Sequence, residues 1–212
     1  MQTVIFDLDG TLLDTLKDLM SAVNAALEAN HMPKRTIDEV RQFVGNGVRS
    51  LMVKAIPDGA ENPAFEKTFA DFRAYYREHC KDDTRPYEGI PPLLEALKQK
   101  GITMAIVSNK LDSAVKELAK DYFGDYITVA IGEMEGVARK PAPDTVFRAL
   151  EELGVGREGA VYVGDSDVDI MTAKNAGLPC VSVTWGFRDR DFLMLHGASR
   201  LIDEPLELLD IL

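Results

Sequence analysis

VIFDLDGT, spanning Val4–Thr11, is the stretch of sequence that decides the fold. Its first residues are apolar, which predicts a buried strand, and they lead into two aspartates and a glycine. Alternate side chains of a strand share a face, so Asp7 and Asp9 are expected to project together from its carboxyl end. Ligands of open α/β sheets bind at that end, and two neighbouring carboxylates there need a cation or a shared proton.

Further apolar runs of strand length recur along the chain, and helical patterns separate them. This alternation predicts an α/β fold, a doubly wound, Rossmann-like parallel sheet with helices on both faces. The expected strands are Thr3–Leu8, Ile102–Ser108, Ile127–Gly132, Ala160–Asp165 and Leu178–Trp185, with a sixth short one at Arg200–Ile202. The expected helices are Pro91–Lys100, Leu111–Phe123, Pro143–Leu153 and Asp167–Ala176, and a glycine follows each of them.

One stretch breaks the alternation, because residues 16–82 contain helical patterns and no strand. Apolar residues between Leu16 and Leu27 recur at helical spacing, and an aromatic stripe does the same between Phe65 and Tyr76. Shorter helical patterns at Ile37–Val44 and Val48–Ile56 lie between them. We therefore expect a small all-helical domain, residues 16–82, inserted after the first strand of a core formed by residues 1–15 and 83–212.

Composition narrows the classes of partner. The 212 residues carry a net charge of −11, which disfavours nucleic acid and anionic lipid because both need a basic surface. We expect no membrane contact, since no apolar run approaches a membrane span. Cys80 and Cys180 lack metal-type spacing and fit two reduced thiols, and no presequence is recognisable before Val4. These features predict a cytoplasmic protein.

Three more polar motifs each follow an apolar run. Ser108-Asn109 can hold phosphate oxygens near a helix N-terminus, although such residues also cap helices. In Arg139–Asp144, two prolines lie close after Lys140, whose charge could neutralise a carboxylate and a phosphoryl oxygen, although a solvated loop lysine is the alternative. In Gly164–Asp169, Asp165 is expected at a strand tip, although acidic residues there are also normal caps. The four motifs can converge on one sheet edge, where carboxylate oxygens suit Mg²⁺.

Together these motifs resemble those of the haloacid dehalogenase superfamily of phosphatases. All four occur in the family's order, and the resemblance extends from the N-terminus to about Trp185. It implies a magnesium-dependent hydrolase that acts on a small phosphate monoester through an aspartyl phosphate. The matching motifs are DLDGT (Asp7–Thr11), SN (Ser108–Asn109), KPAPD (Lys140–Asp144) and GDSDVD (Gly164–Asp169).

The resemblance also implies a role for each matching residue. Asp7 would become the aspartyl phosphate, and Asp9 would protonate the leaving alcohol and then take a proton from the attacking water. Mg²⁺ would be bound by Asp7, Asp165 and the main-chain carbonyl of Asp9. The residues expected to bind the phosphoryl group are Ser108, Asn109 and Lys140, and those expected to support the site are Thr11 and Asp169.

The helical insertion resembles the first cap type of this superfamily, whose residues choose the leaving group. Gly45-Asn46-Gly47-Val48-Arg49 resembles the specificity loop of phosphoglycolate phosphatases, which makes 2-phosphoglycolate the first substrate to test. Arg49 would then meet the substrate carboxylate, and the alternative is a helix–helix turn with a solvated arginine. Trp185–Arg188 resembles a stretch of the same subgroup, where we expect Trp185 to have a packing role.

Several alternatives remain open. Related caps serve sugar phosphates, nucleotides and pyrophosphate. A phosphosugar mutase would share the core, although such mutases often carry valine at the position of Thr11. Dehalogenases of the superfamily lack an acid like Asp9. A non-enzymatic phosphoacceptor domain would also use an aspartate, Mg²⁺ and a lysine, but it lacks a helical insertion. The expected partner is a small phosphorylated metabolite, and the protein is expected to be a monomer or a dimer.

Overall fold

The computed structural model describes residues 2–212, which fold into two compact units. The core unit comprises the chain up to Leu12 together with Pro86–Leu212, and the helical unit comprises Leu13–Arg85. The sequence placed these boundaries after residue 15 and before residue 83. Two short strands that the sequence pattern does not reveal, β2 (Leu13–Asp14) and β3 (Arg85–Pro86), pair with each other where the chain passes from one unit to the other.

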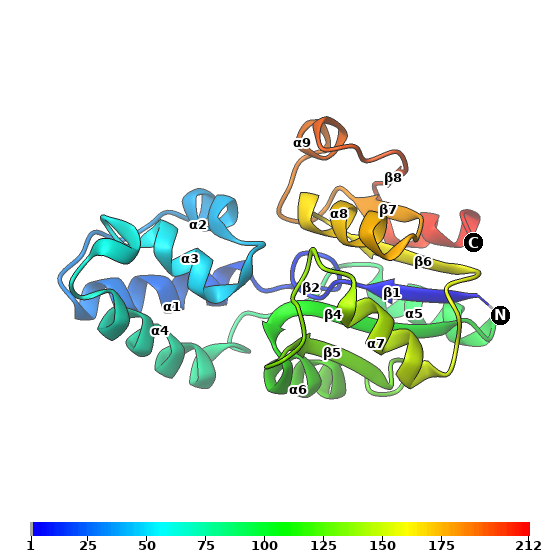
Figure 1. Ribbon diagram of the computed structural model, residues 1–212, viewed down its shortest axis with the longest axis horizontal. Helices are drawn as coiled ribbons and strands as arrows, with labels where there is room; N and C mark the ends of the chain where they lie inside the picture. The colour runs from blue at the N-terminus through cyan, green and yellow to red at the C-terminus, as the bar shows by residue number, and fades with distance from the viewer. Residues whose placement is uncertain (1) are drawn as a thin grey trace. The chain divides into compact units, whose positions relative to one another are not determined.

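The core unit is built on one parallel sheet of six strands, as the sequence predicts. The strand order is β5-β4-β1-β6-β7-β8, so β1 lies in the middle, and every neighbouring pair is parallel. Later strands add to the sheet first on one side of β1 (β4, β5) and then on the other (β6, β7, β8), which makes the sheet doubly wound (Figure 1). The strands are β1 (Thr3–Phe6), β4 (Thr103–Leu111), β5 (Val129–Glu133), β6 (Ala160–Gly164), β7 (Cys180–Val183) and β8 (Leu201–Ile202).

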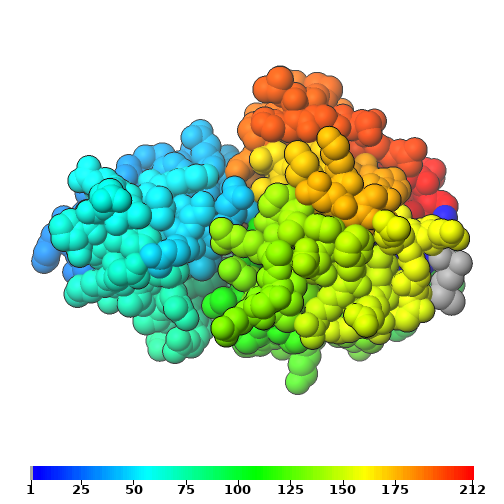
Figure 2. All heavy atoms as spheres, in the orientation of Figure 1, coloured from blue at the N-terminus to red at the C-terminus, as the bar shows by residue number. Residues whose placement is uncertain are grey.

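Helices on both faces bury the strands, and for this reason the strand sequences are apolar throughout rather than alternating. All four residues of β1 are buried. α7 and α8 cover one face, where they pack on Ile5, Val107 and Tyr162, and their atoms hide the sheet in Figure 2. α5 lies on the opposite face in Figure 1. The helices are α5 (Ile90–Gln99), α6 (Asp112–Phe123), α7 (Asp144–Leu153) and α8 (Asp167–Ala176).

The last part of the core unit contains short elements that the sequence analysis did not anticipate. They are α9 (Arg190–Leu195) and the 3₁₀ helix η2 (Pro205–Asp210). α9 begins where the side chain of Asp189 accepts a hydrogen bond from the backbone of Phe192, a normal N-cap. Among the helices formed by residues 2–212, none has the length and apolar character needed to cross a membrane.

The helical unit has its own core. α1 packs on α2 and α4, and α3 packs on both α2 and α4. The aromatic stripe of α4 forms a stack in which neighbouring ring centroids lie 5.5–6.4 Å apart, from Phe65 to Tyr76. The elements are α1 (Leu16–Ala29), α2 (Ile37–Phe43), α3 (Gly47–Ala55), the 3₁₀ helix η1 (Gly59–Glu61) and α4 (Phe65–His79).

A buried carboxylate ties the two ends of the helical unit together. Asp18, in the first turn of α1, accepts hydrogen bonds from the hydroxyl of Thr84 at 2.7 Å and from the backbone N–H groups of Asp83 and Thr84, both at 2.9 Å. Asp18 is buried, so removing these donors would leave a costly unpaired charge. The beginning and the end of the inserted segment are therefore held side by side.

Candidate active site

The register of the central strands brings the sequence motifs together. Phe6 of β1 lies opposite Ile106 of β4 and Val163 of β6, so the residues that follow these three emerge at one edge of the sheet. The backbone N–H of Asp7 donates to the carbonyl of Val163 at 2.9 Å, which fixes the main chain at this position. Strand β1 ends at Phe6, two residues earlier than expected, because the chain turns at once into the loop that carries Asp9.

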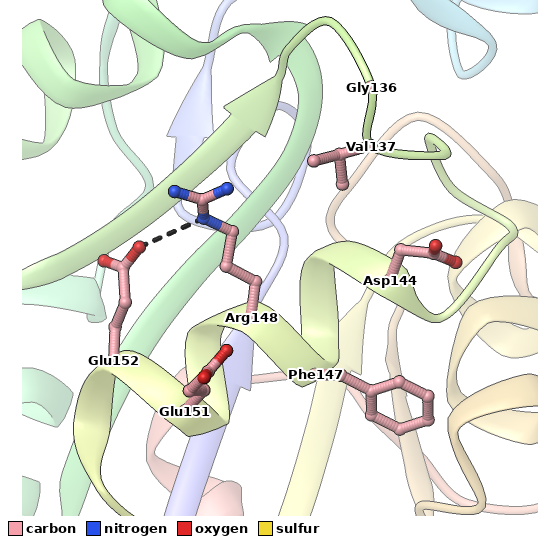
Figure 3. A pocket seen from close by; sticks show the side chains of 7 residues that line it. All are labelled: Gly136, Val137, Asp144, Phe147, Arg148, Glu151 and Glu152. Atoms are coloured by element: carbon pink, nitrogen blue, oxygen red, sulfur yellow. Dashed lines mark hydrogen bonds and ion pairs between the residues drawn. The ribbon is translucent and has the colours of Figure 1, made fainter.

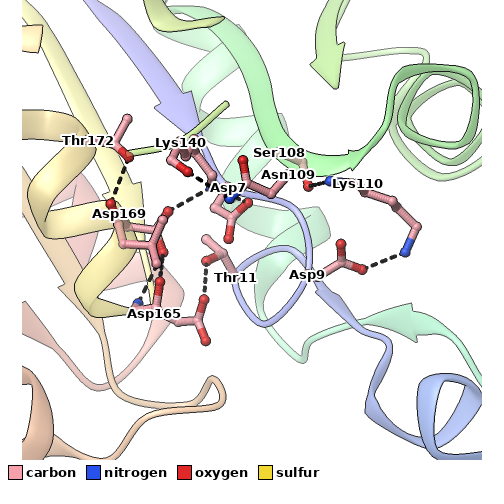
Figure 4. Close-up of polar contacts among 12 residues, drawn as sticks. Asp7, Asp9, Thr11, Ser108, Asn109, Lys110, Lys140, Asp165, Asp169 and Thr172 are labelled. Atoms are coloured by element: carbon pink, nitrogen blue, oxygen red, sulfur yellow. Dashed lines mark hydrogen bonds and ion pairs between the residues drawn. The ribbon is translucent and has the colours of Figure 1, made fainter. Parts of the chain in front are cut away.

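Lys140 is the centre of a buried polar network. Its ammonium lies 2.8 Å from Asp7 Oδ1 and 2.8 Å from Asp169 Oδ1, and it donates to the hydroxyl of Tyr162 at 3.1 Å. Figure 4 shows Asp7, directly after β1, and Asp169, on α8, directed toward this lysine. Asp169 also accepts hydrogen bonds through Oδ2 from the backbone and hydroxyl of Ser166. Lys140 is therefore a fixed internal charge and not a solvated loop lysine.

Burial and charge act in opposite directions on these groups. Burial alone lowers the pKa of Lys140, but the charges of Asp169 and Asp7 outweigh it and raise that pKa well above its usual value. Burial raises the pKa of Asp7 well above its usual value, and the charge of Asp169 adds to this while Lys140 opposes it. The lysine is therefore held as a cation, and a single lysine does not fully compensate the acidic groups around it.

Asp165 lies at the end of β6, at the strand tip that the sequence predicts. Its Oδ1 accepts a hydrogen bond from the Thr11 hydroxyl at 3.3 Å, and its Oδ2 accepts one from the backbone N–H of Phe187 at 2.7 Å. Burial, with the charge of Asp169 as the next cause, raises the pKa of Asp165 to about 7. The carboxyl is held in place but remains close to the boundary between its neutral and charged forms.

Three of these carboxyl groups form a cluster suited to a cation. One oxygen each from Asp7, Asp165 and Asp169 lies within 4.8 Å of the others, and all three residues are buried. Asp169 already binds Lys140, Tyr162 and Ser166, so it holds the lysine in place, and Asp7 and Asp165 are the candidate ligands. Three carboxylates against one ammonium leave a formal charge of −2, which a hard divalent cation such as Mg²⁺ balances.

The motif after β4 contributes three consecutive side chains. The Ser108 hydroxyl accepts a hydrogen bond from the backbone N–H of Lys110 at 3.2 Å, and the Asn109 amide donates to the carbonyl of Lys140 at 3.1 Å. Lys110 itself donates to Asp9 Oδ1 at 2.9 Å. Asn109 thus links the second motif to the third. The sequence analysis gave no role to Lys110, whose ammonium contacts Asp9.

The loop after β7 supports the site in a way that the sequence did not reveal. Besides the hydrogen bond from Phe187 to Asp165, Trp185 Nε1 donates to the carbonyl of Thr11 at 3.0 Å. A Cβ atom at Gly186 would lie 2.3 Å from Asp165 Cβ, and one at Gly10 would lie 2.4 Å from Asp165 Oδ2. Both positions need glycine because the backbone there lies very close to Asp165, the candidate metal ligand. The packing role expected for Trp185 therefore includes a hydrogen bond.

The specificity candidates lie in the helical unit. Asn46 precedes α3, and Gly45 and Gly47 both have positive φ values, of 124° and 78°, which explains the glycines of this loop. Arg49 lies on α3, pairs with Glu66 of α4, and stacks on the Phe65 ring at 4.9 Å. Its side chain is half exposed. The structure thus gives Arg49 a local partner, and its meeting with a substrate carboxylate stays a prediction.

A surface groove of about 680 Å³ lies along α7 (Figure 3). It contains none of the motif residues described above, apart from Asp144 at the end of the third motif. In Figure 3 an ion pair between Arg148 and Glu152 closes one side of this groove. Its lining residues are Gly136, Val137, Asp144, Phe147, Arg148, Glu151 and Glu152. The acidic cluster, rather than this groove, carries the candidate chemistry.

Comparison with known proteins agrees with this geometry. Residues 4–183 match the model of a family described as haloacid dehalogenase-like hydrolase. The chain belongs to this family. It is 36% identical to a phosphoglycolate phosphatase of Aquifex aeolicus over 88% of this chain and 86% of the relative. It is 30% identical to an N-acetylmuramic acid 6-phosphate phosphatase of Pseudomonas aeruginosa over 100% of this chain and 95% of the relative.

A solved structure extends the similarity to three dimensions. A protein from Lactobacillus delbrueckii subsp. bulgaricus superposes with a TM-score of 0.94 at 36% identity and covers 99% of this chain and 97% of its own. The parallel α/β fold expected from the sequence is confirmed. The family and these relatives together support a phosphatase, that is, a phosphoric monoester hydrolase.

Proposed function

We propose that this protein is a magnesium-dependent phosphatase in which Asp7 accepts the phosphoryl group of a small metabolite and then releases it to water. The single observation that carries the proposal is the convergence of Asp7, Lys140 and Asp165 at one sheet edge. Carboxylate nucleophiles divide hydrolysis into two easier steps, transfer to the carboxylate and hydrolysis of the acyl phosphate. Asp7 lies at the sheet edge, where it can reach both a substrate phosphoryl group and a bound cation.

The surrounding groups suit this role for Asp7. A transferring phosphoryl group spreads negative charge over its oxygens, so fixed positive charge and hydrogen-bond donors stabilise the transition state. Lys140 supplies such a charge, and Asp169 and Tyr162 prevent it from moving. Ser108, also at this edge, accepts a hydrogen bond from the Lys110 backbone through its hydroxyl, whose own proton can be donated to a phosphoryl oxygen. When bound by Asp7 and Asp165, Mg²⁺ would supply charge that keeps Asp7 ionised and orients the phosphate.

Asp9 is the proposed general acid and base. It would protonate the leaving oxygen in the first step, and in the second step it would take a proton from the water that attacks the phosphoryl group on Asp7. Its carboxylate is only partly buried and lies in the loop directly after Asp7, so it can reach either oxygen by a change of side-chain rotamer. Hydrolysis therefore needs side chains of the core unit alone, together with Mg²⁺, the substrate and water.

For the substrate we propose 2-phosphoglycolate. The support is the set of curated relatives with that name, of which the Aquifex aeolicus protein is 36% identical, together with the Gly45–Arg49 loop of the helical unit. The relative that is named for N-acetylmuramic acid 6-phosphate makes a phosphorylated sugar acid the second compound to test. We further propose that the helical unit acts as the cap that chooses between them.

The test is a phosphate-release assay over small phosphate monoesters and pyrophosphate, each with and without Mg²⁺. The panel contains 2-phosphoglycolate, N-acetylmuramic acid 6-phosphate, a sugar phosphate, a nucleotide and pyrophosphate. We expect the highest kcat/KM for 2-phosphoglycolate and loss of activity after chelation of the metal. Undiminished hydrolysis in a metal-free enzyme would contradict the proposed chemistry. A higher kcat/KM for another member of the panel would contradict the proposed substrate and leave the chemistry intact.

A further inference from the structure

Lys110 is a buried charge at the site that the proposed chemistry does not use. Its residue is 6% exposed, and its ammonium lies 2.9 Å from Asp9 Oδ1. Figure 4 shows the Asp9 carboxylate pointing toward Lys110, whereas Asp7 points toward Lys140. The two lysines therefore divide the two aspartates of the first motif between them. Burying a second ammonium at the site costs solvation energy, which calls for a reason.

The path of β4 explains how Lys110 reaches this position. β4 pairs with β5 in register up to Val107, and the register then shifts before Leu111 pairs with Glu133. Such irregularities in a strand re-aim side chains, and they are common next to active sites. The hydrogen bond from the Lys110 backbone to the Ser108 hydroxyl lies inside this irregular segment. Lys110 is thus directed to the sheet edge by the backbone and is not a surface residue that has folded inward.

The partner of Lys110 suggests what it binds during turnover. Asp9 must contact the leaving oxygen of the substrate, yet in this structure one of its oxygens accepts from Lys110. A substrate that brings its own carboxylate can replace that oxygen as the acceptor. In 2-phosphoglycolate a single methylene group separates the carboxylate from the leaving oxygen. A carboxylate bound to Lys110 would therefore place the leaving oxygen beside Asp9.

We propose that Lys110 is a specificity-determining residue that binds the carboxylate of the leaving group. The substrate carboxylate replaces Asp9 as the hydrogen-bond acceptor of Lys110, and Asp9 is then free to contact the leaving oxygen. This inference rests on the proposed function and assigns the carboxylate to the core unit. The enzyme selects substrates whose leaving group carries an anion close to the ester oxygen. It does not select monoesters of the same size whose leaving group is neutral. Arg49 is the other candidate for this carboxylate. Its local partner is Glu66, which has no function in the proposed chemistry, whereas the partner of Lys110 is the proposed acid Asp9.

The test compares 2-phosphoglycolate with ethyl phosphate, a neutral-tailed monoester of similar size, in the wild-type enzyme and in Lys110→Met. Hydrogen bonds to charged groups are strong, so we expect the ratio of the two kcat/KM values to fall roughly 10–100-fold, mainly through KM for 2-phosphoglycolate. Lys116→Met is the matched control, because Lys116 forms an exposed ion pair with Asp112 on α6. This control should keep the wild-type ratio.

The outcomes separate the inference from the proposed function. A wild-type enzyme that does not prefer 2-phosphoglycolate would overturn the proposed substrate and the inference with it. A wild-type preference that survives unchanged in a folded Lys110→Met protein would overturn the inference alone. Lys110→Gln, which keeps hydrogen-bond donors without the charge, provides a second variant whose fold is checked by circular dichroism. Unfolding of both variants would assign Lys110 a structural role and would also overturn the inference.

Discussion

The acidic cluster of the core unit and the Gly45–Arg49 loop of the helical unit are built in opposite ways. The charged groups of the cluster are buried, and Lys140, Asp165 and Asp169 each have two or more partners from separate parts of the core unit. Arg49, by contrast, is half exposed and has its partners on a neighbouring helix of the same unit. Buried groups with several partners are held in one geometry, whereas an exposed ion pair exchanges readily with water or a ligand.

This difference indicates what each region can contribute. Positioning a phosphoryl group needs charges that do not move during the reaction, and the cluster provides them. Choosing among leaving groups needs side chains that can change partners, and the half-exposed Arg49 is of that kind. The Lys110–Asp9 pair is buried, and in our proposal it changes partners only when a substrate carboxylate takes the place of Asp9. The comparison therefore predicts large effects on turnover from the cluster and smaller, substrate-dependent effects from the exposed loop.

The largest expected effect is that of Asp7→Asn. The amide is a poor nucleophile and cannot form the acyl phosphate, so turnover should be abolished for every substrate. The measurement is phosphate release from the best monoester of the panel, with purified protein and saturating Mg²⁺. The asparagine keeps the size of the side chain, and near-normal thermal unfolding would show that the fold survives. Full activity in this variant, free of contaminating phosphatase, would contradict the assigned nucleophile.

Asp9→Asn should have the next largest effect. Loss of a general acid typically slows a reaction by roughly 10²–10⁴-fold, and kcat should fall more than KM changes. Monoesters with an activated leaving group, such as 4-nitrophenyl phosphate, need less help from an acid. The loss should therefore be smaller for 4-nitrophenyl phosphate than for an alkyl phosphate. Equal losses on the two substrates would argue that Asp9 serves only to hold the loop.

How far the sequence alone predicts the site depends on where each signal lies. Asp7, Ser108, Lys140 and Asp165 each follow or flank an apolar strand, so the parallel topology brings them to one edge. The order of strands then determines which motifs are neighbours. The six core strands were located to within a few residues for the same reason, because burial on both faces makes each one a continuous apolar run.

The contacts that the sequence did not predict come from features without a side-chain signal. The donor to Asp165 is the backbone N–H of Phe187, and the acceptor for Trp185 is the backbone carbonyl of Thr11. Main-chain groups are the same in every residue, so only the unusual glycines nearby could have marked them, as Gly186 does. The two-residue strands β2 and β3 are too short to produce a periodicity, and the turn to Lys110 depends on a register shift.

The acidic cluster also predicts how stability responds to pH and metal. The pKa of Asp165 is raised from 3.8 to about 7 in the metal-free fold, so the folded protein binds a proton that the unfolded chain releases at lower pH. Its stabilising contribution is complete below about pH 4 and is lost as the pH rises through 7. Mg²⁺ requires the ionised carboxylate and reverses this loss, so metal binding should release protons.

The increase in Tm on adding Mg²⁺ should therefore be larger at pH 8 than at pH 5.5, as measured by thermal unfolding in matched buffers. Asp165→Asn is the control, because it removes both the titration and a metal ligand, and its Tm should respond little to Mg²⁺ at either pH. A metal-induced shift that is constant across this range, or larger at the acidic end, would show that the cation binds elsewhere.

The smallest expected effect, and the one that most sharpens the comparison, is that of Arg49→Ala. Because Arg49 and Glu66 form an exposed pair, the substitution should leave Tm almost unchanged. If Arg49 contacts the substrate carboxylate, KM for 2-phosphoglycolate should rise by at most about tenfold, with no change for ethyl phosphate. Arg41→Ala is a matched control, since Arg41 forms a similar exposed pair with Asp38 on α2.

A double substitution of Arg49 and Lys110 then distinguishes two arrangements. Additive losses would mean that both cations contact the carboxylate, whereas a double variant no worse than Lys110→Met would leave the recognition of that group to the buried edge alone.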